Sequence, residues 1–205
     1  MAFPIPLASK MSGASIDQLA HWRSTKVLRP ELESSKPPYL YSFRDIVALR
    51  TFAWLRGDHS LQLIRKSLDT LRELDLVEHP SSYQLVKLGS SIGIHLAADH
   101  AIDLAKNPGQ ATVGSLADVF ADFETIKHRR VDPLLHPRDG VEVNPGRLGG
   151  WPTITGTRIP YDVVAGLIED GSISAERVGD YYPGVSPQAA RDALDFQLSV
   201  VGAAA

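Results

Sequence analysis

The chain contains no cysteine. Disulfide bonds, thiolate metal sites and cysteine nucleophiles are therefore excluded. It also has no apolar run as long as a membrane span, and its start, Met1-Ala2-Phe3-Pro4, lacks the basic and apolar regions of a secretory signal. We therefore expect a cytoplasmic protein that does not contact a membrane.

The sequence motifs of common catalytic centres are missing as well. No H-E-x-x-H, no G-x-S-x-G and no phosphate-binding glycine loop occur. Two carboxylate groups invite a metal or acid–base interpretation: Asp99 and Asp103 around His100, and Asp118 with Asp122. Because such pairs are common on solvated faces, we expect no catalysis, no cofactor and no metal. A hydrolase would require a metal near Asp118 or Asp122.

The composition is ordinary for a globular protein of one to two domains. Of the 205 residues, 43% are hydrophobic and 22% are charged. The net charge of −3 is unevenly distributed along the chain. Residues 1–80 hold 11 Lys and Arg against 9 Asp and Glu, whereas residues 137–205 hold 5 against 9. A slightly basic front and an acidic back indicate different partners at the two ends.

The first 25 residues have the pattern of a helix-turn-helix. Residues 4–10 can form a short helix, and Ser12-Gly13-Ala14 is a tight turn. Ser15 and Gln18 then form an S-x-x-Q capping box that starts a second helix. In a helix-turn-helix, this second helix presents its N-terminal residues to the major groove of DNA.

Similar signals continue the pattern through about residue 75. Tyr39-Leu40-Tyr41 predicts a short wing strand, and Ser42 with Asp45 forms another capping box, for a helix that ends before Gly57. Ser60 caps the next helix, whose apolar positions follow a three-four-three spacing: Leu61, Ile64, Leu68 and Leu71. This stripe is either a core face or a seam for a partner helix, and we favour the core.

This front part resembles the winged helix-turn-helix of MerR-type regulators over about residues 3–75. The resemblance rests on Gly13-Ala14-Ser15, Leu19, His21-Trp22, Val27-Leu28-Arg29-Pro30 and Tyr39-Leu40-Tyr41-Ser42. It implies a homodimer that binds operator DNA. Two family arginines that contact phosphates are replaced here by Ala20 and Tyr39. The available substitutes are Arg23, Lys26, Arg29, Lys36 and Arg44.

We predict that DNA is contacted by side chains of the second helix and its surroundings. The predicted contacts are Ser15, Gln18, His21, Arg23, Lys26 and Arg44. Glutamine pairs bidentately with adenine and arginine with guanine or phosphate, so Gln18 and Arg23 have the best chemistry for readout. Trp22 has two interpretations, a DNA contact or a core residue, and we favour the core.

Residues 79–136 match no pattern that we can name. Tyr83 to Lys87 and Ile92 to Leu96 predict a β-hairpin around Gly89. Leu116 to Ile126 predicts a helix, and residues 127–130 and 133–140 have the composition of a linker. We expect an α+β connector that is a possible dimerisation region.

The most distinctive stretch is Gly149-Gly150-Trp151-Pro152-Thr153-Ile154-Thr155-Gly156-Thr157-Arg158-Ile159-Pro160. Its glycines and prolines predict a segment of tight turns and not a helix. We name residues 149–160 the strap. Three short helices are predicted after it: one from Pro160 to Gly171, one capped by Ser174 over Ala175 to Tyr182, and one from Ser186-Pro187 to about Val200.

The strap and the helices that follow resemble the DUF433 family over about residues 140–197. The shared features are Gly-Gly-x-Pro-x-Ile-x-Gly-Thr-Arg-Ile-Pro, a helix that ends at Asp170-Gly171, Tyr182-Pro183, and a last helix with Ala193-Leu194. Members are small trihelical, helix-turn-helix-like modules, commonly antitoxins encoded beside PIN-like ribonuclease toxins. The resemblance therefore implies toxin binding, which we assign to Trp151, Thr157 and Arg158.

Two of these toxin-binding assignments have a structural alternative. Arg158 either inserts into an acidic ribonuclease centre or pins the strap by a salt bridge to Asp162 or Asp170. Trp151 either anchors a partner interface or caps the three-helix core. The sequence does not separate these interpretations.

Together, these patterns predict a mainly α (α+β) fold with three domains. They are a winged helix-turn-helix over residues 1–78, the connector over 79–136 and a trihelical toxin-binding domain over 137–205. The predicted function is a VapB-like antitoxin of a VapBC-like module, which silences a PIN-like (VapC-like) ribonuclease toxin and represses its own operon. The alternative is a freestanding MerR-like transcriptional regulator whose C-terminal module senses a ligand or a protein.

Overall fold

The computed structural model describes residues 1–33, 35–73, 79–82, 85–97, 100–106, 111–112 and 119–202. Helices dominate this part of the chain, and the strands form small antiparallel sheets. The predicted mainly α (α+β) class is confirmed. None of the described helices is both long and apolar enough to cross a membrane.

The N-terminal elements are β1 (Phe3–Pro4), α1 (Ile5–Ser12) and α2 (Ile16–Ser24). The turn between the helices uses Gly13 at φ +79°, a conformation that favours glycine. The predicted capping box at Ser15 is present, because its side chain accepts from the backbone N–H of Gln18 and Gln18 reciprocates. The wing strand is β2 (Leu40–Tyr41), which pairs with β1.

Two longer helices complete this part: α3 (Phe43–Leu55) and α4 (Leu61–Glu73). The predicted capping box of Ser42 and Asp45 starts α3. Ile64, Leu68 and Leu71 of α4 are buried, so the apolar stripe of this helix is part of the core. Trp22 is also buried and meets Phe52 edge-on at 6.0 Å, which confirms the core interpretation of Trp22.

A four-stranded antiparallel sheet follows α4 and the 3₁₀ turn Pro80–Ser82. Its strands are β3 (Leu85–Leu88), β4 (Ser91–Ala97), β5 (His100–Asp103) and β6 (Ala111–Thr112), paired in chain order. The predicted hairpin around Gly89 is confirmed as β3 and β4, and two more strands extend it. The carboxylates Asp99 and Asp118 lie outside the described residues.

The helix predicted over Leu116 to Ile126 is wrong for the described part. Residues 123–124 form β7 (Phe123–Glu124), which pairs with β8 (Arg130–Val131) in a hairpin. A tertiary interaction overrides the helical pattern: the buried guanidinium of Arg50 donates to the backbone carbonyls of Val119 and Ala121. Those carbonyls therefore accept hydrogen bonds from a distant side chain and not from the backbone N–H groups of a helix.

The linker predicted over residues 127–130 and 133–140 is wrong as well. Residues 127–129 form the turn of the β7–β8 hairpin, Arg130 begins β8, and Leu134 is buried in the core. Arg50 explains much of this order, since its guanidinium also donates to Met11 O and Asp132 O, each at 2.7 Å. One arginine of α3 thus joins α1 to the segments on both sides of the hairpin.

The C-terminal part begins with β9 (Val141–Glu142), the 3₁₀ turn Leu148–Gly150 and β10 (Thr153–Ile154), which pairs with β9. The helices are α5 (Tyr161–Glu169), α6 (Val178–Tyr181) and α7 (Pro187–Gly202). Three helices were predicted here and are confirmed. The Ser174 cap was wrong, because a 3₁₀ turn, Ala175–Arg177, precedes α6 and Ser174 makes no side-chain cap bond.

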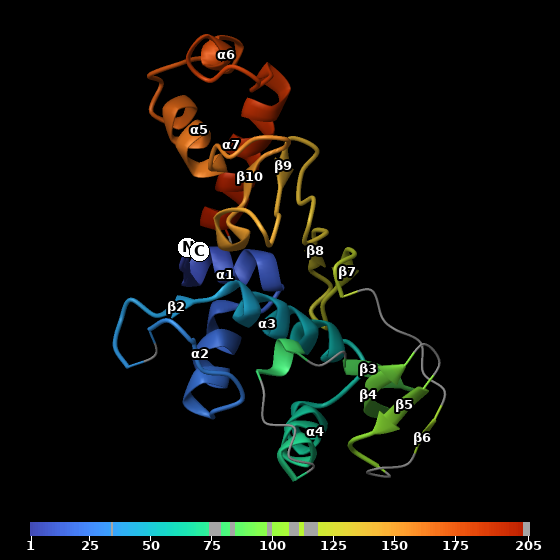
Figure 1. Ribbon diagram of the computed structural model, residues 1–205. Coiled ribbons are helices and arrows are strands. Elements are labelled where there is room, and N and C mark those ends of the chain that lie inside the picture. Colours follow the sequence, from blue (N-terminus) through green and yellow to red (C-terminus); the bar gives the residue numbers. More distant parts are fainter. Residues whose placement is uncertain are drawn as a thin grey trace.

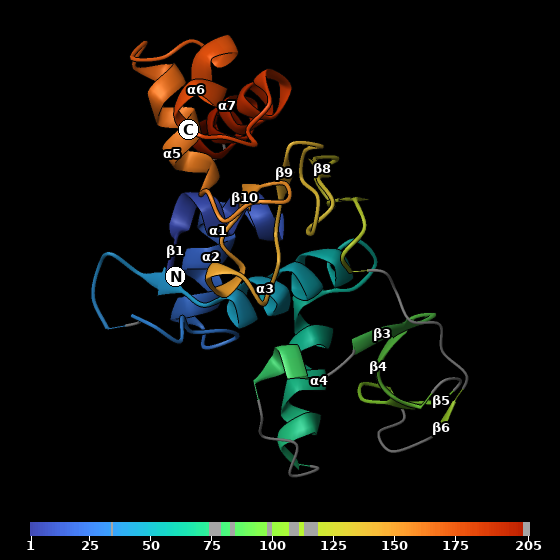
Figure 2. The ribbon, with the colours of Figure 1, turned by 45° about the horizontal axis from the view of Figure 1, so that its top comes forward.

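The core is continuous from the first residues to the last helix. Phe3 lies 5.4 Å from Trp151 between ring centroids, and Tyr161 meets Phe196 of α7 edge-on at 4.9 Å. Helices α5–α7 gather at one end of the molecule beyond α1, and the four-stranded sheet lies at the other end beside α4 (Figures 1 and 2). Packed contacts therefore cross the predicted boundary at residue 136, and the three-domain division stays a prediction.

Candidate nucleic-acid interface

Helix α2 has one buried face and one exposed face. Leu19 and Trp22 hold it against the core, whereas Asp17, His21 and Ser24 are exposed. The capping box and the αL turn at Gly13 fix where the helix begins. The exposed face therefore has a defined start and orientation relative to α1, as a helix-turn-helix requires.

The side chains of Ser15 and Gln18 are used at the beginning of α2. Ser15 Oγ accepts from Gln18 N at 3.2 Å, and Gln18 Oε1 accepts from Ser15 N at 2.8 Å. Bidentate pairing with adenine needs both the carbonyl and the amino group of glutamine. In this conformation the side-chain carbonyl of Gln18 already accepts a hydrogen bond from Ser15 N. Its amino group is therefore the group that can donate a hydrogen bond to DNA.

Arg23 joins α2 to the wing. Its guanidinium lies over the Tyr39 ring, 3.5 Å from the ring centroid. Tyr41 beside it is buried, and burial raises the pKa of its hydroxyl while Arg23 opposes the shift. Tyr39 of the wing thus holds the Arg23 guanidinium against the start of the wing strand.

The remaining cations frame this face. Lys26 and Arg29 are exposed just after α2. Arg44, in the first turn of α3, lies 3.7 Å from Glu31 and is also exposed. The predicted residues thus come from α2, the segment after it and the first turn of α3. Ser15 and Gln18 serve mainly as a helix cap.

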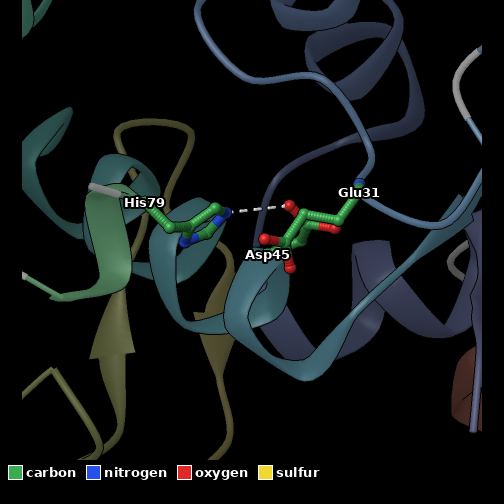
Figure 3. Close-up of side chains that lie close together, drawn as sticks. All are labelled: Glu31, Asp45 and His79. Carbon is green, nitrogen blue, oxygen red and sulfur yellow. Dashed lines mark hydrogen bonds and ion pairs between the residues drawn. The ribbon is translucent and has the colours of Figure 1, made fainter. Parts of the chain in front are cut away.

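A hydrogen-bond network around the buried Asp45, which the sequence did not predict in full, holds the segments on both sides of the wing. Asp45 is fully buried, and its Oδ2 accepts from the backbone N–H groups of Glu31 and Ser42 at 2.9 and 2.8 Å. Its Oδ1 meets His79 Nε2 at 3.1 Å (Figure 3). Glu31 accepts from the Ser42 hydroxyl. The capping box predicted the role of Asp45, but no local signal indicated His79, which is 34 residues away.

Glu31, Asp45 and His79 are also a possible metal triad, because one ligand atom from each lies within 4.8 Å of the others. Both oxygens of Asp45 already have partners that donate hydrogen bonds or carry a ring N–H. These partners account for the burial of the carboxylate without an ion. We interpret the group as the clamp that holds the wing against the start of α3.

The strap is held by a second local network. The Arg147 guanidinium pairs with the Glu142 carboxylate and donates to Thr157 O at 2.7 Å. Glu142 also accepts from Gly156 N at 3.0 Å, and Thr157 Oγ1 accepts from Ile159 N. Thr157 therefore shapes the turn of residues 154–159, and the exposed Arg158 lies on that turn.

The alternative salt bridge of Arg158 is not found. Asp162 accepts from Trp151 Nε1 at 3.1 Å, and Asp170 accepts from Ser172 N. Within the described residues, no hydrogen bond or ion pair involves the Arg158 side chain. Trp151 is half-buried between Phe3 and Tyr161, so its ring joins the front of the molecule to α5.

Comparisons with known proteins give a family match for the C-terminal part and relatives that cover a larger share of the chain. Residues 141–196 match the family described as "Protein of unknown function (DUF433)". The chain is 28% identical over 146 residues to Rv1830 of Mycobacterium tuberculosis (strain H37Rv), named an uncharacterized HTH-type transcriptional regulator, and to Mb1861 of Mycobacterium bovis, which has the same description. The match covers 65% of this chain, and the chain spans about two thirds (64%) of the length of these relatives.

The fold itself is shared with a solved structure. The crystal structure of Rv2018 from Mycobacterium tuberculosis aligns with a TM-score of 0.57 and 18% sequence identity, over 94% of this chain and 96% of that one. At this identity the likeness concerns the fold alone. It extends through the helix-turn-helix, the middle sheet and the C-terminal helices, because nearly the whole chain is covered.

Proposed function

We propose that this protein is a DNA-binding transcriptional regulator that acts through α2 and the wing. The exposed face of α2, braced by the stack of Arg23 on Tyr39, is the observation that carries this proposal. Cations surround that face, and anionic backbone phosphates supply most of the affinity in protein–DNA complexes. The HTH-type relatives support the same function.

A binding titration tests this function. A fluorescent 40-bp duplex from the region upstream of the protein's own gene is titrated at several salt concentrations, beside a scrambled duplex of equal length. We expect tighter binding to the upstream duplex and an affinity that falls as salt rises. Equal, salt-independent affinity for both duplexes would contradict the proposal.

We further propose that the protein is an antitoxin, which holds a PIN-like ribonuclease with the strap and represses its own operon as a homodimer. The support is the resemblance of residues 140–197 to antitoxin modules and the exposed Arg158 on a turn held by Glu142 and Arg147. PIN-like ribonucleases hold their metal with carboxylates, and a guanidinium pairs bidentately with a carboxylate. Occlusion of that centre requires no catalysis by this chain.

The acidic C-terminal part agrees with this division of roles. Residues 137–205 carry an excess of four acidic residues, which disfavours a second grip on DNA by the C-terminal helices. A protein partner with a cationic rim fits this surface better. The three-domain division at residues 78 and 136, with toxin contacts at Trp151, Thr157 and Arg158, belongs to this proposal.

Co-expression with the adjacent small open reading frame tests the antitoxin role. Wild type is expected to rescue growth and to co-purify with the neighbour, and Arg158→Ala to release ribonuclease activity while keeping its melting temperature. Arg177→Ala, at an exposed arginine near α6, is the matched control and is expected to behave like wild type. An Arg158→Ala variant that still silences the neighbour refutes insertion of Arg158.

The alternative function is a freestanding MerR-like regulator whose C-terminal module senses a ligand or a protein. It shares the DNA-binding face and differs only in the role of the strap. A harmless neighbouring gene product that forms no complex, together with operator binding, would favour it. Light scattering on the purified chain measures whether either form is a homodimer.

A further inference from the structure

The β7–β8 hairpin is a basic element whose sequence resembles a linker. Strand β7 pairs with β8 in the register Phe123 with Val131 and Glu124 with Arg130. Thr125 N donates to Arg129 O, and His128 N donates to Thr125 O, so the turn is closed by its own backbone bonds. Its three cations, Lys127, Arg129 and Arg130, and His128 occupy four consecutive positions, and all four residues are exposed.

This hairpin packs directly on the turn of the helix-turn-helix. A Cβ atom at Gly13 would lie 2.5 Å from Val131 Cγ2 and 3.3 Å from Phe123 Cζ. The guanidinium of Arg129 donates to the carbonyl of Gly13. Gly13 is therefore needed twice, for its positive φ and for the close approach of the hairpin.

The anchoring determines where the basic side chains lie. Gly13 is two residues before Ser15, the N-cap of α2. From Arg129, whose side chain reaches Gly13, to Lys127 the chain extends at most about 7 Å. The basic turn therefore lies beside the N-terminal end of α2, which is the end that a helix-turn-helix directs at DNA. Strand β8 is in contact with α1, and Figure 1 shows the hairpin on that side of the molecule.

We propose that the β7–β8 hairpin is an additional wing that contacts the phosphate backbone of duplex DNA next to the N-terminus of α2. This inference rests on the proposed DNA-binding function and adds a surface to it. Arg129 would bridge Gly13 and a phosphate, since one bond to Gly13 leaves further N–H donors of its guanidinium. Lys127 and Arg130 supply the other two charges.

The acidic residues of the hairpin are compatible with this role. Arg130 pairs with Asp122 at 3.0 Å and His128 with Glu124 at 2.9 Å, and all four side chains are exposed. Exposed pairs contribute little to stability, so a phosphate can replace the carboxylate as the partner of Arg130. Three cations against Asp122 and Glu124 leave the hairpin with an excess positive charge, whereas the C-terminal helices are acidic.

Salt titrations of a double variant, Lys127→Ala with Arg130→Ala, test the wing. Neither side chain holds the hairpin to Gly13, so we expect an unchanged melting temperature. With the 40-bp upstream duplex, affinity at low salt is expected to fall on the order of tenfold, and the slope of log K against log salt to become shallower by about one for each lost phosphate contact. A matched double variant of the C-terminal part, Arg177→Ala with Arg191→Ala, is expected to keep the wild-type slope.

The outcomes separate this inference from the function on which it rests. If wild type binds the duplex and the double variant has the same affinity and slope, the wing is refuted and DNA binding stands. If wild type binds no duplex at all, both fail. A double variant that binds DNA normally but loses the co-purified neighbour would assign the hairpin to a protein partner and would also overturn the wing.

Discussion

The face of α2 and the strap present their arginines in different ways. Within the strap, the turn of residues 154–159 that carries Arg158 is supported by residues nearby in the sequence: Glu142, Arg147 and Thr157. The face of α2 depends on distant segments: Arg23 stacks on the wing, Asp45 meets His79, and the β7–β8 hairpin packs on Gly13. A short motif can therefore specify the turn that carries Arg158, whereas the α2 face depends on the folding of segments that are distant in the sequence.

Arg50 gives the sharpest test of this difference. Its buried guanidinium donates to four backbone carbonyls, and substitution by Leu leaves those carbonyls without their donor. We expect Arg50→Leu to lower the free energy of unfolding by at least about 3 kcal/mol, because each bond to a charged group contributes about 1.5–3 kcal/mol. Urea unfolding followed by circular dichroism measures this change.

The control for Arg50 is Arg147→Leu in the strap. Arg147 is partly exposed and donates to one carboxylate and one carbonyl, compared with the four buried carbonyls of Arg50, so we expect a smaller loss of stability. Equal losses for the two variants would show that the front and the strap depend on their arginines to the same extent. The stability of the front would then depend no more on long-range contacts than that of the strap.

Arg23 tests whether the α2 face works as a unit with the wing. Arg23→Ala removes a cation and its stack on Tyr39, so we expect operator binding to weaken by about 1–3 kcal/mol. Arg158→Ala, which changes a cation of the strap, is expected to leave operator affinity unchanged. Fluorescence anisotropy at matched salt measures both variants. Unchanged affinity for Arg23→Ala would remove this residue from the DNA interface.

The smallest expected effect concerns His59, in the turn between α3 and α4. This side chain is buried, its Nε2 has no partner within the described residues, and burial lowers its pKa below the ordinary value. The unfolded chain therefore binds a proton first as the pH falls, so the stability that neutral His59 contributes is present above about pH 6.5 and is lost below it.

Urea unfolding at pH 7.5 and pH 5.5 measures this loss. We expect wild type to lose more stability between these pH values than His59→Phe, by an amount on the order of 1 kcal/mol. His136→Phe is the control, since His136 is exposed. A His59→Phe variant with the wild-type pH dependence would show that His59 does not titrate differently on folding.

The prediction from sequence was best where the signal was local. Both capping boxes, the helices after the strap and the β3–β4 hairpin were confirmed, because each is specified by residues within one element or turn. The prediction failed at residues 119–130, where apolar spacing indicated a helix and charged residues indicated a linker. There Arg50 takes the carbonyls, and Gly13 provides the space for a hairpin.

The candidate site shows the same division. The sequence indicated which side chains of α2 and the strap have suitable chemistry for partners. In the structure His21 and Arg158 are exposed, whereas Gln18, Trp151 and Thr157 are half-buried. The sequence indicated the use of Gln18 in a capping box, but it did not indicate that Arg23 stacks on Tyr39. Local spacing carries no information on partners that are brought together only by packing.

The sequence by itself determined the helix starts, the turns and the shape of the strap, since caps, glycines and prolines act on backbone dihedral angles within a few residues. Only the tertiary structure decided that Trp151 joins the front to the back and that the basic hairpin lies at the start of α2. The physical reason is that buried aromatic rings and buried hydrogen-bond donors contact the groups that lie next to them in the folded core, whatever their separation along the chain.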